Sequence, residues 1–264
     1  MFRPPTPLVK NLLIINIGIA VAQFVLSMDL GQQFGLYFLF SDNFQPYQFV
    51  TYMFLHDTEG IRHIFGNMLI LYFVGPMLEN FLGQKKFLIL YMVTGLGGGF
   101  LYTAANYVEV NGIRNDVEAY VANPNPEDFN RLIVKHVNRP TPQVMDLVDK
   151  YARNENSPRY RQDSISVAYL LYNRYGDYPM VGASGAVFGI LAMLMILFPN
   201  TEILLFFTFP IKIKFLVGGL IIYEVFSDLE RVPGDNVAHL AHLGGALFAW
   251  ILFKVWKQNR GDFY

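Results

Sequence analysis

Three short polar clusters interrupt long apolar stretches of this 264-residue sequence, and each carries side chains that could take part in catalysis. The clusters lie at residues 63–67, 182–185 and 239–245. A strongly polar group at membrane depth is costly, so such groups are by default candidates for function. A serine in one cluster and histidines in the others favour hydrolysis in which a hydroxyl attacks and an imidazole takes its proton.

Ser184 is the candidate nucleophile, and it lies between Gly182 and Gly185 at the start of an apolar run. Backbone N–H groups in the first turn of a helix lack intrahelical partners, and together with the positive helix end they can stabilise an oxyanion. The flanking glycines leave room for a substrate backbone. Gly185 and Gly189 also form a small-xxx-small face, so tight helix packing alone remains an alternative.

His242 is the candidate general base, because a neutral imidazole can accept the serine proton and later donate it to the leaving amine. His239 lies three residues earlier, but His242 is fourth in its apolar segment, as Ser184 is in its own. Gly244 and Gly245 also allow the His242 helix to approach a neighbour closely. The alternatives are an interface histidine or a metal site. A metal needs more ligands and no HExxH motif occurs, so we expect no metal.

His63 and Asn67 form the third candidate pair. Positions i and i+4 share one face of a helix, so both side chains can point at one spot. In a hydrolase they would donate hydrogen bonds to the oxyanion. The alternative is that they only bond a neighbouring helix.

The composition indicates that membrane helices position these clusters. Hydrophobic residues make up 53% of the chain and charged residues 16%, against about 25% charged in a typical soluble domain. The absence of cysteine excludes disulfides and thiolate chemistry, and a net charge of -1 gives no basic field for nucleic acid. A span needs roughly 20 mostly apolar residues, and six candidates occur at 9–26, 63–82, 87–107, 181–198, 213–226 and 239–256.

Lysine and arginine gather in alternate connections, which predicts that both termini lie in the cytoplasm, in a bacterial cytoplasmic membrane. In this topology the second, fourth and sixth spans all run inward. Each of the three polar clusters opens one of these spans, so the clusters lie at the same depth. We therefore expect them to converge on one site near the outer surface.

Residues 108–178 are polar and nearly balanced in charge, which predicts a soluble extracytoplasmic insertion between the third and fourth spans. Asn125-Pro126 and Thr141-Pro142 are typical helix starts, the second before residues 144–151, and residues 164–175 form a third candidate helix. We expect a small helical layer on the membrane surface. It either docks substrates or is a decoration without a direct role.

Together these residues resemble the rhomboid family of intramembrane serine proteases. The matching motifs are residues 182–185 for the family's GxSG, 63–67 for its HxxxN and 241–245 for its catalytic histidine helix. Glu79 with Gly83, followed by Phe87 and Tyr91, looks like the family's junction between helices two and three.

The resemblance implies an all-α polytopic protein with a six-transmembrane-helix bundle, here with a helical insertion between helices three and four. It implies that Ser184 and His242 form a dyad without a third acid, and no acid is evident near His242 in the sequence. The Ser184 amide, His63 and Asn67 would form the oxyanion hole, and Gly182, Gly185 and Gly245 would serve substrate access and packing. Transmembrane protein substrates would be cleaved in the lipid bilayer without a cofactor.

Two other classes remain open. A catalytically silent relative would bind or escort membrane proteins, although such proteins typically lack the serine or the histidine. A transporter or channel would carry charged residues along several spans, whereas Glu224 is the only acid well inside the predicted ones. The sequence indicates no oligomeric state.

Overall fold

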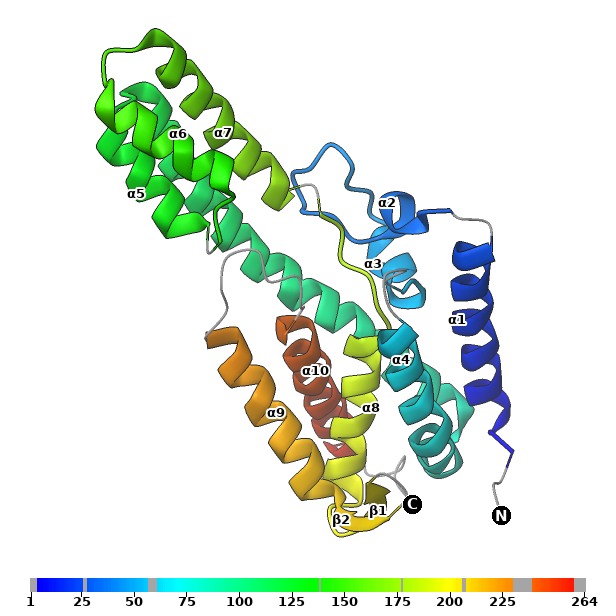
Figure 1. Ribbon diagram of the computed structural model, residues 1–264. Helices are drawn as coiled ribbons and strands as arrows, with labels where there is room; N and C mark the ends of the chain where they lie inside the picture. The colour runs from blue at the N-terminus through cyan, green and yellow to red at the C-terminus, as the bar shows by residue number, and fades with distance from the viewer. Residues whose placement is uncertain are drawn as a thin grey trace.

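The computed structural model describes residues 4–25, 28–56, 61–137, 139–176, 178–205, 208–229 and 239–258. This part of the chain is mainly helical (Figure 1). Its long helices are α1 (Pro7–Val25), α4 (Ile61–Ala122), α8 (Ser184–Leu197), α9 (Ile213–Leu229) and α10 (His239–Gln258). Every apolar segment predicted from the sequence lies almost entirely within one of these helices.

Three of the described helices, α1, α4 and α10, are long and apolar enough to cross a membrane. Helices α8 and α9 have 14 and 17 residues, fewer than the roughly 20 that a straight crossing needs. Helix α4 has 62 residues and folds back on itself, as Figure 1 shows, so it forms two long arms. The protein is therefore a helical membrane protein, and six crossings remain a prediction.

Gly83 makes the fold-back in α4. Its φ of 78° is in a region that side chains disfavour, and it separates two arms at residues 61–82 and 84–122. Before the turn, the buried Glu79 carboxylate accepts the backbone N–H groups of Leu8 and Val9 at 3.1 and 2.9 Å. An anion at the start of α1 satisfies N–H groups that no helical carbonyl reaches. The predicted junction agrees with this geometry.

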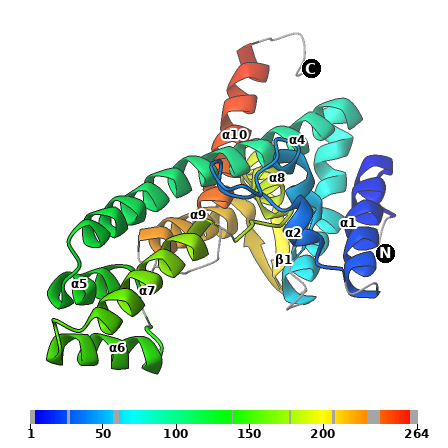
Figure 2. The same ribbon diagram turned by 90° about the horizontal axis from the view of Figure 1, so that it is seen from above.

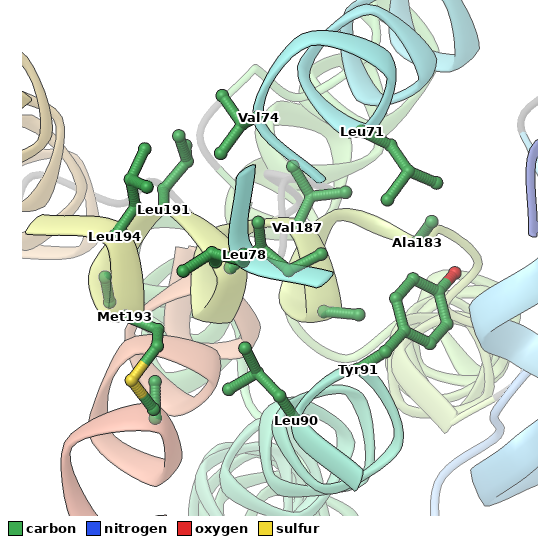
Figure 3. Close-up of a cluster of buried hydrophobic side chains, with 14 of the residues drawn as sticks. Leu71, Val74, Leu78, Leu90, Tyr91, Ala183, Val187, Leu191, Met193 and Leu194 are labelled. Atoms are coloured by element: carbon green, nitrogen blue, oxygen red, sulfur yellow. The ribbon is translucent and has the colours of Figure 1, made fainter. Parts of the chain in front are cut away.

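The main core surrounds α8, which packs against both arms of α4 and against α10. Figure 3 shows Leu71 and Val74 from the first arm and Leu90 and Tyr91 from the second arm around Val187 of α8. This arrangement buries one helix between three others, and most of α8 is inaccessible to solvent. Helix α8 is consequently fixed in position along its length, beginning at Ser184.

Several short elements were not predicted from the sequence. Helices α2 (Leu30–Phe34), α3 (Gln48–Thr51) and the 3-10 helix η1 (Tyr52–Phe54) follow α1, and a hairpin of β1 (Glu202–Leu205) and β2 (Phe209–Lys212) joins α8 to α9. None of these elements exceeds five residues. They are too short to carry the hydrophobic periodicity that identifies an element in a sequence.

The insertion contains the three expected helices, α5 (Pro126–His136), α6 (Pro142–Arg153) and α7 (Pro158–Gly176). Asn125 caps α5 by accepting the Asp128 N–H at 2.9 Å, and Thr141 caps α6 through the Val144 N–H at 3.4 Å. Both capping predictions are confirmed.

The structure adds two features to these expectations. The second arm of α4 continues beyond residue 107, where the third predicted span ends, and reaches Ala122. Helices α5 and α7 pack against this α4 extension, residues 108–122, and share a second core with it that includes Val117, Phe129 and Tyr151 (Figures 1 and 2). The buried face of the extension does not form an apolar run, so the sequence did not reveal it. The helical layer on the membrane surface stays a prediction.

Candidate active site

Ser184 is in the first turn of α8, as the sequence predicted, but it is the first residue of the helix and not the fourth, because α8 begins three residues after the expected start of the span. Gly182, two residues earlier, has a φ of 139°, which favours glycine, and its N–H donates to the Tyr52 carbonyl at 3.0 Å. Met180 exchanges two backbone hydrogen bonds of 2.9 Å with Leu36. The chain that leads into Ser184 is thus held as an extended segment against the region after α1.

Helices α8 and α10 approach each other closely at Gly185 and Gly245. A Cβ atom at Gly245 would lie 2.0 Å from the Gly185 carbonyl oxygen, and one at Gly185 would lie 3.3 Å from the Ala241 oxygen. Gly98 of α4 lies at the same junction, where a Cβ would be 2.6 Å from the Ala241 oxygen. No side chain fits at Gly245, so the packing role predicted for it has a direct geometric basis.

The His242 imidazole contacts α8 near the start of that helix. Its ring stacks on Phe188, with centroids 4.5 Å apart and planes inclined by 3°. Phe188 is four residues after Ser184 and therefore one turn away on the same helix face. The structure thus places His242 against a residue one helical turn after Ser184, and the pairing of His242 with Ser184 itself stays a prediction.

Glu224 of α9 contradicts the expectation that no acid lies near His242. One carboxylate oxygen lies 3.0 Å from His242 Nδ1, and the other lies 2.6 Å from His239 Nδ1. The His239 contact has hydrogen-bond geometry, whereas the His242 contact is close but not aligned for a full hydrogen bond. The Glu224 and His239 side chains are 7% and 6% exposed and that of His242 is 14% exposed, so the pairing is in a largely dry environment.

These three residues are also the one group, among the described residues, that could hold a metal ion. Each offers one ligand atom, and the three atoms lie within 4.8 Å of one another. A ligand motif at fixed spacing within one helix does not include this set, because Glu224 comes from α9 and the two histidines come from α10.

Asn67 and His63 both lie near the start of α4, as predicted. Asn67 is 6% exposed, and its Nδ2 donor is buried without a hydrogen-bond partner. Leu71 follows one turn later and belongs to the cluster around Ala183 and Val187 (Figure 3), so Asn67 is on the face of α4 directed toward α8. The side chain of His63 is outside the part of the chain that the structure describes.

Sequence reasoning missed Glu224, Phe188 and Tyr52. Glu224 carried a detectable signal, because an acid in the middle of an apolar helix needs a partner. Phe188 and Tyr52 are aromatic residues among many in this chain, and nothing in the sequence distinguished them. Tyr52 is buried and donates its hydroxyl to the Gly95 carbonyl at 2.7 Å, which ties η1 to the second arm of α4.

Comparison with known proteins gives three relatives. RHOMBOID-like protein 12, mitochondrial, from Arabidopsis thaliana is 26% identical over 262 residues, which cover 97% of this chain and 60% of that protein. An uncharacterised mitochondrial rhomboid protein of Schizosaccharomyces pombe is 35% identical over 86 residues, covering 30% of this chain and 22% of that protein. Rhomboid protein 1, mitochondrial, from Saccharomyces cerevisiae is 34% identical over 91 residues, covering 31% and 25%.

The chain spans about 60% of the length of the Arabidopsis relative. All three relatives are mitochondrial by name, so the expectation of a bacterial cytoplasmic membrane finds no support in them. A model of the rhomboid domain matches residues 43–111 and 164–258, which include all three polar clusters and exclude most of the insertion. With more than half of its residues in that match, the chain belongs to the rhomboid family.

Proposed function

We propose that this protein is an intramembrane serine endopeptidase in which Ser184 is the nucleophile and His242 is the general base. The observation that carries the proposal is the stacking of the His242 ring on Phe188, one turn after Ser184 on α8. A general base must come within about 2.6–3.2 Å of the hydroxyl that it deprotonates, often only once substrate is bound. The close approach of α10 to α8 at Gly245 supports that contact.

The reaction follows from these two roles. The Ser184 Oγ attacks the scissile carbonyl carbon while its proton passes to His242 Nε2. The C–N bond then breaks, and the same proton leaves with the amine product. Water attacks the resulting ester, gives its proton to His242 and releases the acid product together with a regenerated Ser184 hydroxyl.

The oxyanion formed in each step requires donors that are already in place. Ser184 is at the start of α8, where backbone N–H groups have no intrahelical acceptor. The Asn67 Nδ2 group is a second candidate, because it is buried without a partner on the helix face directed toward α8. We assign His63 as a third donor from its position one turn before Asn67.

The substrate class follows from the location of the site. The helices that carry it belong to a membrane bundle, so the proposed substrates are transmembrane segments of other proteins. An intact helix buries its carbonyl groups in hydrogen bonds, so the scissile segment must unwind before attack. Gly182 and Gly185 have no side chains that would obstruct an extended backbone beside Ser184.

A fluorophosphonate probe tests the proposal directly, because it reacts covalently with an activated serine. We expect the purified protein to be labelled, and Ser184→Ala to abolish both labelling and cleavage of a fluorogenic membrane substrate without changing Tm. Labelling at another serine would refute the assignment. A folded wild-type protein that is not labelled and does not cleave would favour a silent rhomboid relative that binds membrane proteins.

A further inference from the structure

The two histidines of α10 converge on a single carboxylate from a different helix. The Glu224 oxygens lie 2.6 Å from His239 Nδ1 and 3.0 Å from His242 Nδ1, and all three side chains are largely buried. A buried carboxylate without partners costs several kcal/mol, so Glu224 requires donors at this position. The arrangement therefore needs a proton on at least one Nδ1 atom that faces it.

We infer that Glu224 is a positioning residue for His242: its negative charge, 3.0 Å from Nδ1, keeps the imidazole proton on Nδ1 and so leaves Nε2 as the basic nitrogen. In a neutral imidazole one nitrogen carries the proton and the other accepts. A carboxylate beside Nδ1 selects the tautomer whose Nε2 can take a proton from Ser184. The inference rests on the proposed function and replaces its dyad with a Ser184–His242–Glu224 array.

The carboxylate also acts during the reaction. When His242 takes the serine proton it becomes an imidazolium, and the positive charge forms 3.0 Å from a Glu224 oxygen. Attraction between opposite charges is strong where water is excluded, so the charged intermediate is stabilised relative to the neutral ground state. Phe188 fixes the plane of the ring and Glu224 fixes its rotation within that plane.

His239 has a separate part in this arrangement. Its Nδ1 makes the aligned hydrogen bond to the other Glu224 oxygen, and its ring packs edge-on against Tyr223 with centroids 6.4 Å apart. This bond restrains the carboxylate through the oxygen that His242 does not approach. His239 thereby holds Glu224 in place. This role explains why α10 carries two histidines one turn apart although the proposed reaction uses only one general base.

Two variants at one position test the inference. Glu224→Gln keeps the shape and one acceptor oxygen but loses the charge, and Glu224→Met removes the acceptor while remaining compatible with a membrane interior. Loss of the acid from a soluble serine protease triad reduces kcat by about 10⁴. Since the His242 contact is not fully aligned, we expect a smaller loss of about 10²-fold in kcat for Glu224→Met, with Glu224→Gln intermediate and KM within about twofold of wild type.

The matched control is Glu79→Gln, which alters a buried carboxylate at the other end of the bundle. Glu79 accepts backbone N–H groups of α1 and has no part in the proposed chemistry, so this variant should lower Tm and leave kcat unchanged. If Glu224 had only a structural role, its variants would lower Tm and leave kcat unchanged, as is expected for Glu79→Gln. A folded Glu224→Met variant with wild-type kcat would overturn this inference and would leave the proposed function unaffected.

Two further outcomes are decisive. If folded wild-type protein is not labelled at Ser184 by fluorophosphonate, both this inference and the proposed function fail. The second outcome comes from elemental analysis of active wild-type protein. One tightly bound metal ion per chain that is lost in the Glu224 variants would overturn the inference. An ion bound to Nδ1 would take the place of the proton that Glu224 is inferred to hold there. We expect no stoichiometric metal and full activity after chelation.

Discussion

Asn67 shows how one buried side chain can be assigned to the reaction rather than to the fold. Its Nδ2 group has no acceptor, although an unsatisfied buried donor costs about 1–3 kcal/mol. Asn16, which is also buried, in α1, instead donates its Nδ2 to the Leu12 carbonyl at 2.8 Å. A donor that the folded state leaves unused is available for an oxyanion that forms only during catalysis.

Asn67→Ala should therefore reduce kcat by about 10²–10³, the usual cost of one oxyanion donor, with little change in KM. The same substitution should leave Tm close to wild type, because no native hydrogen bond of the Asn67 amide N–H is lost. Asn16→Ala is the matched control and should lower Tm without reducing kcat. Steady-state kinetics with a membrane substrate and thermal unfolding measure both quantities; a lower Tm with normal kcat for Asn67→Ala would assign it to the fold.

At the scale of the element, the site depends on how closely α10 approaches α8. The glycines at this contact bring backbone against backbone, which places His242 beside the face that carries Ser184. Packing of this kind is typical of membrane helices, where small residues replace the hydrophobic effect as the basis of association. We therefore expect Gly245 to set the position of His242, the proposed general base.

Gly245→Ala should consequently reduce both stability and cleavage. A methyl group 2.0 Å from the Gly185 carbonyl oxygen meets backbone, which cannot rotate away, so α10 must move and carry His242 with it. Overpacking typically costs 1–3 kcal/mol, which should lower Tm by several degrees. Gly218→Ala in α9 is the control, since a Cβ there meets nothing within 4 Å and should leave Tm and kcat unchanged. Normal activity in Gly245→Ala would show that the close contact does not position the base.

The same scale explains what could be predicted from the sequence. Apolar runs, the Gly83 junction and the Asn125 and Thr141 caps are local signals, and each predicted its element correctly. The pairing of Glu224 with His242 is not local, because it depends on the rotation of α9 about its axis relative to α10. Short elements such as η1 are held by hydrogen bonds from the extended segment before Ser184. These bonds join residues far apart in the sequence, so no local pattern predicts them.

At the scale of the whole molecule, the described residues form two cores that meet along α4. The main core surrounds α8, and the second core contains residues of the α4 extension and of α5, α6 and α7. The rhomboid match stops at residue 111, near the start of the second core, and resumes at residue 164, within α7. Ion pairs such as Lys135 with Asp116 join α5 to the α4 extension and, despite the opposing effect of burial, lower the pKa of Asp116.

Because the second core contains none of the proposed catalytic residues, its removal should leave the chemistry intact. Replacing residues 112–177 with a flexible Gly/Ser linker deletes the whole of α5, α6 and α7 together with the α4 extension against which they pack, so no half of that core is left exposed. It retains Met180, whose hydrogen bonds with Leu36 hold the segment leading into Ser184. We expect fluorophosphonate labelling of Ser184 to persist at a rate within about tenfold of wild type, while cleavage of individual membrane substrates changes according to whether they contact the insertion. A folded variant that loses all labelling would show instead that the insertion helps to build the site, most directly by fixing where α4 presents Gly98 to the junction of α8 and α10.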